Sequence, residues 1–485
     1  MHPFLQEIHL EPQSESPIYV QIANQIVSVI QRGILPPGFK LPGSRILADF
    51  MGVHRQTVVA ALEELVLEGW LVSKSKKGTF VNQSLPEIRP KKLSESALGT
   101  YPQNTGFGFC KNTRLDIPVF STARLQFNDG IPDTRLAPLH ELARHTATLL
   151  KSHKNPYYLA YTHTQGSLRL RQALSKMLGQ NRGIKAPPEN IFISRGTIMA
   201  LYSLAQILIH PGDRVIVGET NYRTADLCFE QAGAQICRIP VDEQGLVIEA
   251  IDKLASKNPV RALYVTSHHH HPTTVALSPE RRLKLLEMAR KYGFAIIEDD
   301  YDYDFHYQNR PLLPLASADC EGWVIYIGSF TKAFAPAIRT GYIVAPSDLI
   351  EELNKYRRIM DRQGDVVQEE AIAYMLEDGT IRRYLNKALK AYRERKELFC
   401  ELLRDKFSGR IHFKEPEGGM AVWAQFAFEY PLFEISQKAA AKKLYISDGK
   451  WYNPPGQNLN ACRMGFASMD LGEIEQAIEI LEKCF

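Results

Sequence analysis

The strongest constraint on the fold is a regular alternation of short apolar runs and amphipathic stretches in the middle of the chain. Apolar residues at helical spacing predict helices, of which 197–209 and 279–292 are the clearest. Runs rich in β-branched residues predict strands at 190–194, 214–217, 262–266, 295–298 and 324–326. Strands that alternate with helices form a mostly parallel sheet. The sequence therefore predicts an α/β domain.

One lysine follows the last of these strands in a setting that suits a covalently bound cofactor. The segment Tyr326–Gly341 reads YIGSFTKAFAPAIRTG and contains Lys332. Such a lysine can hold pyridoxal 5′-phosphate (PLP) as a Schiff base, and Ser329, Thr331 and Arg339 can bind its phosphate. Burial and nearby positive charge keep part of such an amine neutral. We therefore predict PLP as the cofactor and Lys332 as the catalytic residue.

Three other stretches carry groups that PLP requires. Asp299 follows an apolar strand and can keep the pyridine nitrogen protonated, and Tyr301 can reach the phenolic oxygen. A turn before a predicted helix places Gly196 and Thr197 at a helix N-terminus, where backbone N–H groups bind phosphate. Tyr222 is the candidate for the ring that stacks on the cofactor, and a tyrosine of the core is the alternative.

Four consecutive histidines, His268–His271, raise the question of a metal site. No CxxC or HExxH set accompanies them, so no metal is expected. His271 is placed instead near the phenolic oxygen of PLP. Asp302 and Asp304 are expected to be solvated charges on an acidic loop.

The first eighty residues have a different pattern, with three helices followed by a hairpin. The predicted helices are 18–32, 44–51 and 55–68, and the predicted strands are 70–73 and 79–81. A basic turn, 74–78, joins the two strands. This order is typical of a winged helix-turn-helix, whose third helix presents its N-terminal side chains to the major groove.

The candidates for DNA contacts lie at the starts of the second and third helices and in the basic turn. Arginine and glutamine can bind base edges, whereas hydroxyls and lysines suit phosphates. The predicted contacts are Ser44, Arg45, His54, Arg55, Gln56, Thr57, Lys76 and Lys77. Ser44 is also the expected N-cap of the second helix. The alternative is an amphipathic helical cap with solvated charges.

Composition narrows the class of protein. The 485 residues carry a formal net charge of +4, too small to indicate nucleic-acid binding by itself. No apolar run reaches the roughly 18–20 residues of a membrane span, and the N-terminus lacks the pattern of a secretion signal. The seven cysteines include no CxxC pair, which argues against a disulfide framework. A cytoplasmic protein without membrane contact is expected.

Two sets of motifs resemble known families. Residues 17–81 contain ILPPGFKLPGSRILADFMGVHRQTVVAALEEL and KKGTFV, and they resemble the GntR-type winged helix. Residues 128–466 contain NDGIPDTRLAPL, GSLRLRQAL, IIEDDYDYDFHY, YIGSFTKAFAPAIRTGY and ACRMGFA, which resemble fold-type I PLP enzymes of the aspartate aminotransferase class. The combination is most similar to the MocR-type subfamily of GntR regulators.

The resemblance implies a domain organisation and an assembly. Residues 1–82 would be the winged helix, 83–117 a linker, and 118–485 a fold-type I domain with a smaller C-terminal α+β subdomain from about residue 349. Arg463, in ACRMGFA, matches the arginine that binds the carboxylate of the ligand. A head-to-tail homodimer is expected.

The histidine loop departs from the pattern of the family. Thr266-Ser267 replaces Thr-Pro, and histidines replace the glutamine and the aromatic residue before Pro272. The contacts of this loop therefore stay open.

These motifs together predict a PLP-dependent transcriptional regulator. It would bind double-stranded DNA through the winged helix and sense a small amino-compound effector by aldimine exchange at Lys332. Two alternatives stay open: a working aminotransferase with an accessory DNA-binding module, and a DNA-binding protein with a vestigial PLP site. The sequence does not specify the effector, the operator or the direction of regulation.

Overall fold

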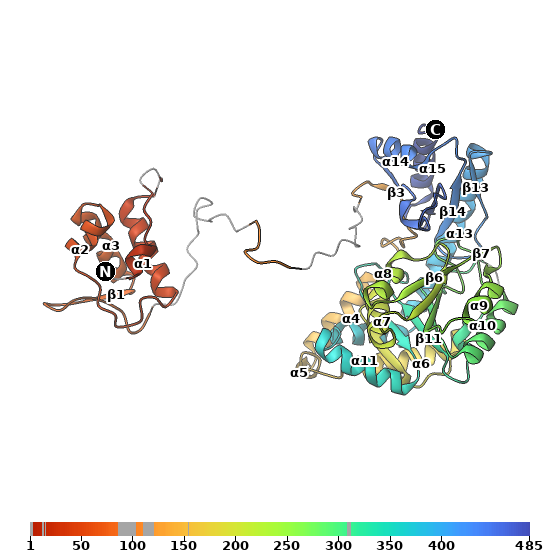
Figure 1. Ribbon diagram of the computed structural model, residues 1–485, viewed down its shortest axis with the longest axis horizontal. Helices are drawn as coiled ribbons and strands as arrows, with labels where there is room; N and C mark the ends of the chain where they lie inside the picture. Colours follow the sequence, from red (N-terminus) through yellow and green to blue (C-terminus); the bar gives the residue numbers. More distant parts are fainter. Residues whose placement is uncertain are drawn as a thin grey trace. The chain divides into compact units, whose positions relative to one another are not determined.

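A computed structural model describes residues 3–11, 14, 16–85, 103–109, 121–153, 155–307 and 312–485. The chain divides into two compact units, Met1–Lys111 and Asn112–Phe485 (Figure 1). Most of the predicted linker, 83–117, lies outside the described residues. No helix of the described part is long and apolar enough to cross a membrane.

The N-terminal unit is a helical domain that ends in a hairpin. Its elements are a short 3-10 helix (Pro3–Glu7), α1 (Ile18–Gln31), α2 (Ser44–Met51), α3 (Arg55–Leu67), β1 (Leu71–Lys74) and β2 (Gly78–Val81). The strands pair antiparallel, from Leu71 opposite Val81 to Lys74 opposite Gly78. All three helices contribute to one apolar core, which contains Ile26, Leu47 and Leu65. The predicted winged helix is confirmed.

The larger unit is built around a mostly parallel sheet with the order β4-β12-β11-β10-β9-β5-β6. Its strands are β4 (Ile191–Ser194), β5 (Arg214–Gly218), β6 (Gln235–Ile239), β9 (Ala262–Val265), β10 (Ala295–Asp300), β11 (Val324–Ser329) and β12 (Gly341–Val344). Among the described strands of this sheet, β12 runs antiparallel to its neighbours β11 and β4, and the other pairings are parallel. The predicted α/β class is confirmed, although β6 and β12 were not among the predicted strands.

Helices cover both faces of this sheet (Figure 1). One face packs against α7 (Thr197–Leu208), α8 (Arg223–Gln231) and α11 (Ser347–Met360). The other face packs against α4 (Leu139–Lys151), α6 (Leu168–Arg182), α9 (Ile248–Ala255), α10 (Pro279–Tyr292) and α12 (Val366–Glu377). Successive residues of β5 alternate between the two cores, because Val215 and Val217 join the first and Ile216 joins the second. Burial on both faces explains why the strands read as continuous apolar runs.

The C-terminal part forms a second, mixed layer. It contains α13 (Thr380–Phe407), α14 (Leu432–Ala441), α15 (Leu471–Glu482) and an antiparallel sheet of β13 (Ile411–Phe413), β14 (Ala421–Phe426) and β16 (Ala461–Gly465). The strand β3 (Leu125–Phe127) joins this part by parallel pairing with β15 (Leu444–Ile446). Residues just before position 129 are therefore built into the same core as α13 and α15. Shorter elements of the larger unit are α5 (Asn155–Tyr158), β7 (Val241–Asp242) and β8 (Gly245–Leu246).

Candidate functional site

The residues predicted to contact DNA lie at the starts of α2 and α3 and at the tip of the hairpin. His54 is the N-cap of α3, and its Nδ1 accepts a hydrogen bond from the backbone N–H of Gln56 at 3.3 Å. Arg55 Nε donates to Ser44 Oγ at 3.3 Å, which links the two helix starts. Arg45, Arg55 and Gln56 are exposed, and Thr57 is half-buried. The predicted capping role of Ser44 is wrong, because the N-cap of α2 is Gly43 and the cap has no side-chain hydrogen bond.

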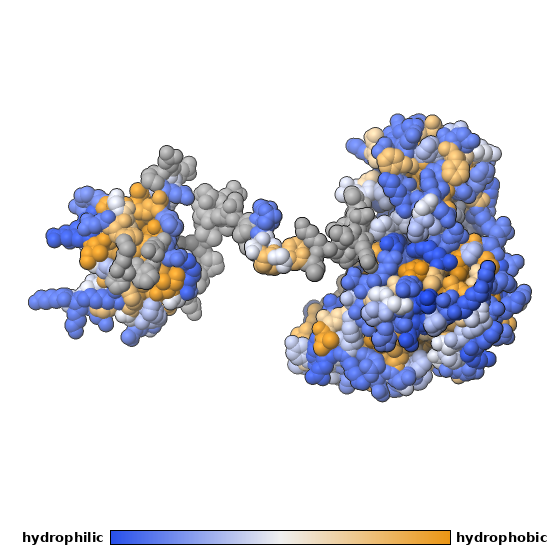
Figure 2. Space-filling model, viewed as in Figure 1, coloured by the Kyte–Doolittle hydropathy of each residue, from blue (hydrophilic) through white to orange (hydrophobic). Residues whose placement is uncertain are grey.

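The tip of the hairpin is a basic projection. Lys74, Lys76 and Lys77 are all exposed, and the tip is hydrophilic in Figure 2. Lys74 Nζ lies 5.1 Å from the centre of the Phe80 ring, which gives the hairpin a cation–π contact. The first turn of α3 contains no acidic residue to oppose a phosphate. The charge distribution therefore suits a polyanion.

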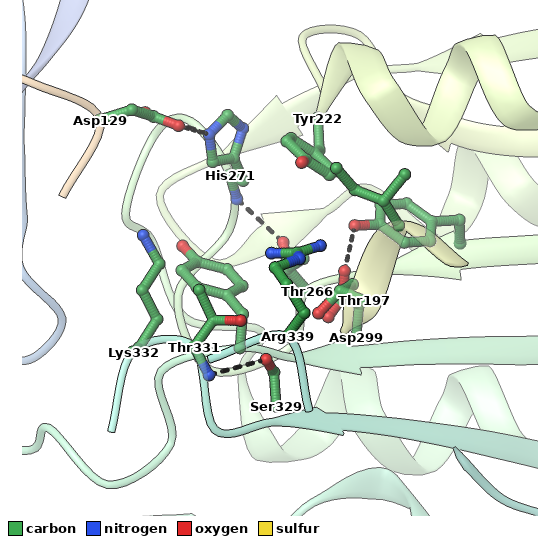
Figure 3. Close-up of a pocket in the computed structure, with 13 residues that line it drawn as sticks. Asp129, Thr197, Tyr222, Thr266, His271, Asp299, Ser329, Thr331, Lys332 and Arg339 are labelled. Carbon is green, nitrogen blue, oxygen red and sulfur yellow. Dashed lines mark hydrogen bonds and ion pairs between the residues drawn. The ribbon is translucent and has the colours of Figure 1, made fainter. Parts of the chain in front are cut away.

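A cavity in the larger unit gathers residues that follow different strands of the parallel sheet (Figure 3). The predicted residues that line it are Thr197, Tyr222, His271, Asp299, Tyr301, Ser329, Thr331, Lys332 and Arg339. The carboxyl ends of parallel strands meet at one edge of a sheet, and ligands bind there. This geometry explains how residues far apart in the sequence come together.

One end of the cavity, the cofactor end, presents hydroxyls, a guanidinium and a helix start. Ser329 Oγ accepts a hydrogen bond from the backbone N–H of Thr331 at 3.0 Å. Thr331 Oγ1 is buried and has no hydrogen-bond partner among the described residues. Thr197 opens α7, whose first N–H groups have no partner within the helix. These groups suit a phosphate.

Gly196 lets Arg339 approach the start of α7. It has φ +81°, and a Cβ at this position would lie 2.8 Å from Arg339 Nη2. Glycine tolerates both this conformation and the close contact. Arg339 Nη2 itself donates to the carbonyl of Arg195, at 3.4 Å. The guanidinium is thus held beside the helix N-terminus and still reaches the cavity.

Lys332 lies in the turn after β11 and points into the same cavity (Figure 3). Its Nζ donates to the carbonyl oxygen of Gly130 at 2.5 Å. Burial lowers the pKa of Lys332, and the charge of Arg463 lowers it further, whereas Asp129 opposes the shift. A lowered pKa increases the share of neutral amine, which is the form that attacks an aldehyde.

Asp299, at the end of β10, offers a free carboxylate oxygen. Tyr264 donates its hydroxyl to Oδ2 at 2.8 Å, and the buried Oδ1 has no hydrogen-bond partner in the described part of the chain. Burial raises the pKa of Asp299 to about 7, and Asp300 and Asp302 add to the shift. An unpaired buried acceptor is costly, and the N–H of a pyridinium ring would satisfy it.

Aromatic rings line the space between these groups. Tyr222 and His271 make an edge-to-face contact with ring centres 5.1 Å apart. Burial raises the pKa of Tyr222 to about 12, so its hydroxyl is neutral. The hydroxyl of Tyr301 donates to the carbonyl of His269 at 3.0 Å, and its oxygen can still accept a hydrogen bond.

The other end of the cavity, which we call the effector end, is lined by Asp129, a residue that was not among the predicted site residues. Asp129 Oδ2 lies 2.9 Å from His271 Nε2, and its Oδ1 lies 2.9 Å from Arg463 Nε and accepts from the Tyr452 hydroxyl at 3.1 Å. Asp129 comes from the loop after β3, and its partners come from three later segments. Asp129 stands in the stretch NDGIPDTRLAPL, which carried the family resemblance but did not by itself assign a role to this acidic residue.

Arg463 is buried on β16, with 1% of its surface exposed. Its Nη1 donates to the carbonyl of Pro272 at 3.3 Å, and its Nε forms the ion pair with Asp129. Burial alone would lower the pKa of Arg463, but Tyr301 and Asp129 outweigh it and raise the pKa. The guanidinium is charged, and the Asp129 carboxylate already contacts it at Nε.

The first two histidines of the run do not line the cavity and pair with buried acids instead. His268 Nδ1 lies 3.2 Å from Asp300 Oδ1, and His269 Nδ1 lies 2.8 Å from Asp302 Oδ1. The expectation of solvated charges is wrong for Asp302, which is buried with 3% exposure, and Asp304 pairs with Arg182 at 3.0 Å. Within the described ranges, no set of three or more His, Cys, Asp or Glu side chains is arranged to hold a metal ion.

Comparison with known proteins assigns both units. Residues 125–481 match the model of the aminotransferases of class I and II, and residues 18–81 match that of the bacterial regulatory proteins of the gntR family. The chain belongs to the aminotransferase class I and II family. Its N-terminal unit is a GntR-type DNA-binding domain, and the two domains in this order are the MocR-type architecture.

Similar proteins have the same organisation or the same fold. The chain is 27% identical over 489 residues to the probable rhizopine catabolism regulatory protein MocR of Rhizobium meliloti, covering 98% of this chain and 95% of the relative. It is 29% identical over 398 residues to the pyridoxine biosynthesis transcriptional regulator PdxR of Corynebacterium glutamicum, covering 82% and 81%. The crystal structure of a multiple substrate aminotransferase from Thermococcus profundus shares the fold, with a TM-score of 0.70, 24% identity and coverage of 75% and 91%.

The cofactor of this aminotransferase domain is PLP. The cavity fits it, because the buried Asp299 Oδ1 and Thr331 Oγ1 have no partner among the described residues and Gly196 leaves room beside the helix start. The protein combines this domain with a DNA-binding domain, as transcriptional regulators of the MocR type do.

Proposed function

We propose that this DNA-binding protein senses a small amino compound at Lys332. The observation that carries the proposal is a single amine of lowered pKa, set in a cavity with an unpaired Asp299 oxygen, in a chain that begins with a winged helix. When bound, PLP supplies an aldehyde that forms a reversible bond with a primary amine. The amine can be that of Lys332 or that of an effector.

The residues of the cavity have distinct roles in this proposal. Ser329, Thr331 and Arg339 bind the phosphate together with the N–H groups of Gly196 and Thr197. The roles of the other side chains are as follows: Asp299 accepts from the pyridinium N–H, Tyr222 packs against the ring, and Tyr301 and His271 lie near the phenolic oxygen. His271 Nδ1 is buried without a partner in the described residues, which supports this placement.

Sensing would act through the contact that Lys332 makes when its amine is free. Its Nζ then donates to Gly130, whose segment follows β3 and pairs through β3 with the C-terminal part. An effector that takes the place of Lys332 favours the arrangement to which it binds more tightly. We propose that this change reaches the DNA-binding domains of a head-to-tail homodimer in the cytoplasm.

The experiment is a mobility-shift titration of the upstream DNA with the cofactor-loaded protein, with and without a panel of primary amines. The expected result is an amine-dependent change in the apparent Kd for DNA that is lost in Lys332→Ala and kept in Lys355→Ala, a variant of an exposed lysine. Multiple turnovers with an amino donor and a keto acid, without specific DNA binding, would contradict the proposal and indicate an aminotransferase.

The DNA contacts can be separated by class. Arg55→Ala is expected to cost about 1–3 kcal/mol and to relax specificity at one base position, because a base contact discriminates between sequences. Lys76→Ala is expected to weaken binding to all sequences alike and to reduce the salt slope by about 1. Equal effects of both variants on specific and nonspecific DNA would contradict the assignment of Arg55.

A further inference from the structure

The wall of the cavity next to Lys332 carries a negative charge. Asp129 lines the cavity, with 44% of its side chain accessible (Figure 3). The carbonyl oxygen of the next residue, Gly130, accepts a hydrogen bond from Lys332 Nζ at 2.5 Å. Burial opposes ionisation, but His271 and Arg463 outweigh it and keep the pKa of Asp129 below its usual range. A ligand whose amine replaces that of Lys332 therefore has this carboxylate beside it.

The positive charge that faces Asp129 is already engaged. Burial lowers the pKa of His271, whereas Tyr301 and Asp129 outweigh burial and raise the pKa of Arg463, so the guanidinium is the stronger cation of the two. Arg463 Nε is 2.9 Å from Asp129, and Nη1 donates to Pro272. Arg463 Nη2 has no hydrogen-bond partner within the described part of the chain. This nitrogen lies against Gly130, and a Cβ added at Gly130 would be 3.3 Å from it.

A carboxylate entering the cavity would meet an occupied arginine. Bidentate binding needs two parallel N–H groups, but Nη1 donates to Pro272, and Asp129 Oδ1 fills the space 2.9 Å from Nε in an ion pair without hydrogen-bond geometry. The incoming group would have to displace Asp129, and the two carboxylates would then repel each other. An ammonium or a hydroxyl group, in contrast, can donate to the accessible oxygens of Asp129.

We propose that Asp129 selects, as effectors, amines without a carboxylate beside the amino group, and that it favours a second cationic group on the ligand. This inference rests on the proposed function, because the ligand must bind at the cavity of Lys332. It identifies Asp129 as a specificity-determining residue and a diamine or simple amine as the ligand class.

The test compares three ligands of the cofactor-loaded, full-length protein. L-Norvaline and butylamine differ only in the carboxylate, and putrescine adds a second amino group to butylamine. Apparent Kd values are measured by calorimetry and by the absorbance change of the cofactor. In the unmodified protein we expect the tightest binding for putrescine, then butylamine, and binding about tenfold weaker for L-norvaline.

The Asp129→Asn variant keeps the size of the side chain and removes its charge, which releases Arg463. We expect L-norvaline to bind about tenfold more tightly and putrescine about tenfold more weakly than in the unmodified protein. The control, Glu434→Gln, removes an exposed charge on α14 and should leave all three Kd values unchanged.

Two results would overturn the inference while leaving the proposed function intact. One is tighter or equal binding of L-norvaline relative to butylamine in the unmodified protein, which is decisive even if the variant fails to fold. The other is an unchanged ligand order in Asp129→Asn. If no amine altered the calorimetric trace or the absorbance of either protein, the proposed function itself would be wrong, and this inference with it.

Discussion

The two ends of the cavity differ in how their polar groups are satisfied. At the cofactor end, Thr331 Oγ1 and Asp299 Oδ1 are buried without partners in the described part of the chain. At the effector end, Asp129 is shared by His271, Arg463 and Tyr452. An unpaired buried polar atom costs stability, so the cofactor end is arranged for a group that the chain does not supply. The carboxylate at the effector end is instead held by groups of the protein, so a ligand that binds there must compete with them.

The largest effect is expected for Lys332, which lies between the two ends of the cavity and is the proposed attachment point of the cofactor. In Lys332→Ala, the amount of cofactor that borohydride traps on the protein should fall to background, because Lys332 is the only lysine among the described residues that line the cavity. Lys355→Ala, which removes an exposed lysine of α11, is the control and should trap as much as the unmodified protein. Unchanged trapping in Lys332→Ala would show that the cofactor is attached elsewhere.

The two acids of the cavity are expected to respond to pH in opposite ways. Burial raises the pKa of Asp299 in the folded state to about 7, above the 3.8 of an unperturbed aspartate, so its contribution to stability is present at low pH and is lost as pH rises through about 7. The cofactor-free Asp299→Asn variant should therefore gain on the order of 2 kcal/mol relative to the unmodified protein between pH of about 5 and about 8, since one pKa unit corresponds to about 1.4 kcal/mol.

Denaturant unfolding at the two pH values provides the measurement. Asp129→Asn is the matched control, because the pKa of Asp129 is lowered and its contribution is lost only when the pH falls below the usual range of an aspartate. The free-energy difference between Asp129→Asn and the unmodified protein should thus be constant over this window. If the free-energy difference between Asp299→Asn and the unmodified protein were also the same at both pH values, the predicted contrast between the two acids would be wrong.

The two arginines provide a sharper version of the same comparison. Arg339→Ala should weaken PLP binding by roughly 10- to 100-fold, the effect of losing a charge-assisted hydrogen bond of about 1.5–3 kcal/mol. Arg463→Ala should change PLP affinity only a few-fold, because its guanidinium pairs with Asp129. Fluorescence titration of the cofactor-free variants measures both values, and Arg358→Ala, on the surface of α11, is the control. Equal losses for Arg339 and Arg463 would contradict the division of the cavity.

The smallest expected effect concerns the buried hydroxyl of the cofactor end. Thr331→Val keeps the shape of the side chain and should weaken PLP binding by roughly 2- to 10-fold, which corresponds to one neutral hydrogen bond. The same titration measures it, and Thr148→Val, an exposed position on α4, serves as the control. Tighter cofactor binding in Thr331→Val would mean that the hydroxyl does not contact the phosphate.

The sequence predicted the cofactor end better than the effector end for a physical reason. Lys332, Asp299 and Thr197 each follow a recognisable strand, and parallel strands bring such positions to one edge. Asp129 follows a strand of three residues, and that strand pairs with a segment near the C-terminus. No periodicity in the sequence encodes such a long-range pairing.

Predictions from local sequence patterns were also wrong where a side chain makes a tertiary contact. Ser44 has the chemistry of an N-cap, yet its hydroxyl accepts from Arg55 and the cap position falls on Gly43. The acidic loop after β10 suggested solvent exposure, but Asp302 is buried against His269. In both cases the partner comes from a different part of the chain.

The loop of Asp129 and the strand of Arg463 share their backbone bonding. The N–H of Gly465 donates to the carbonyl of Asn128 at 2.7 Å, and Asn128 Nδ2 donates to Ser468 Oγ at 2.8 Å. Asn128 is also the single residue between β3 and Asp129, so the position of the Asp129 backbone is fixed by the strand and by these hydrogen bonds. A single substitution at residue 129 can therefore change the charge of the cavity lining while the backbone around it stays in place. Related proteins could then come to recognise different classes of signal molecule through one mutation.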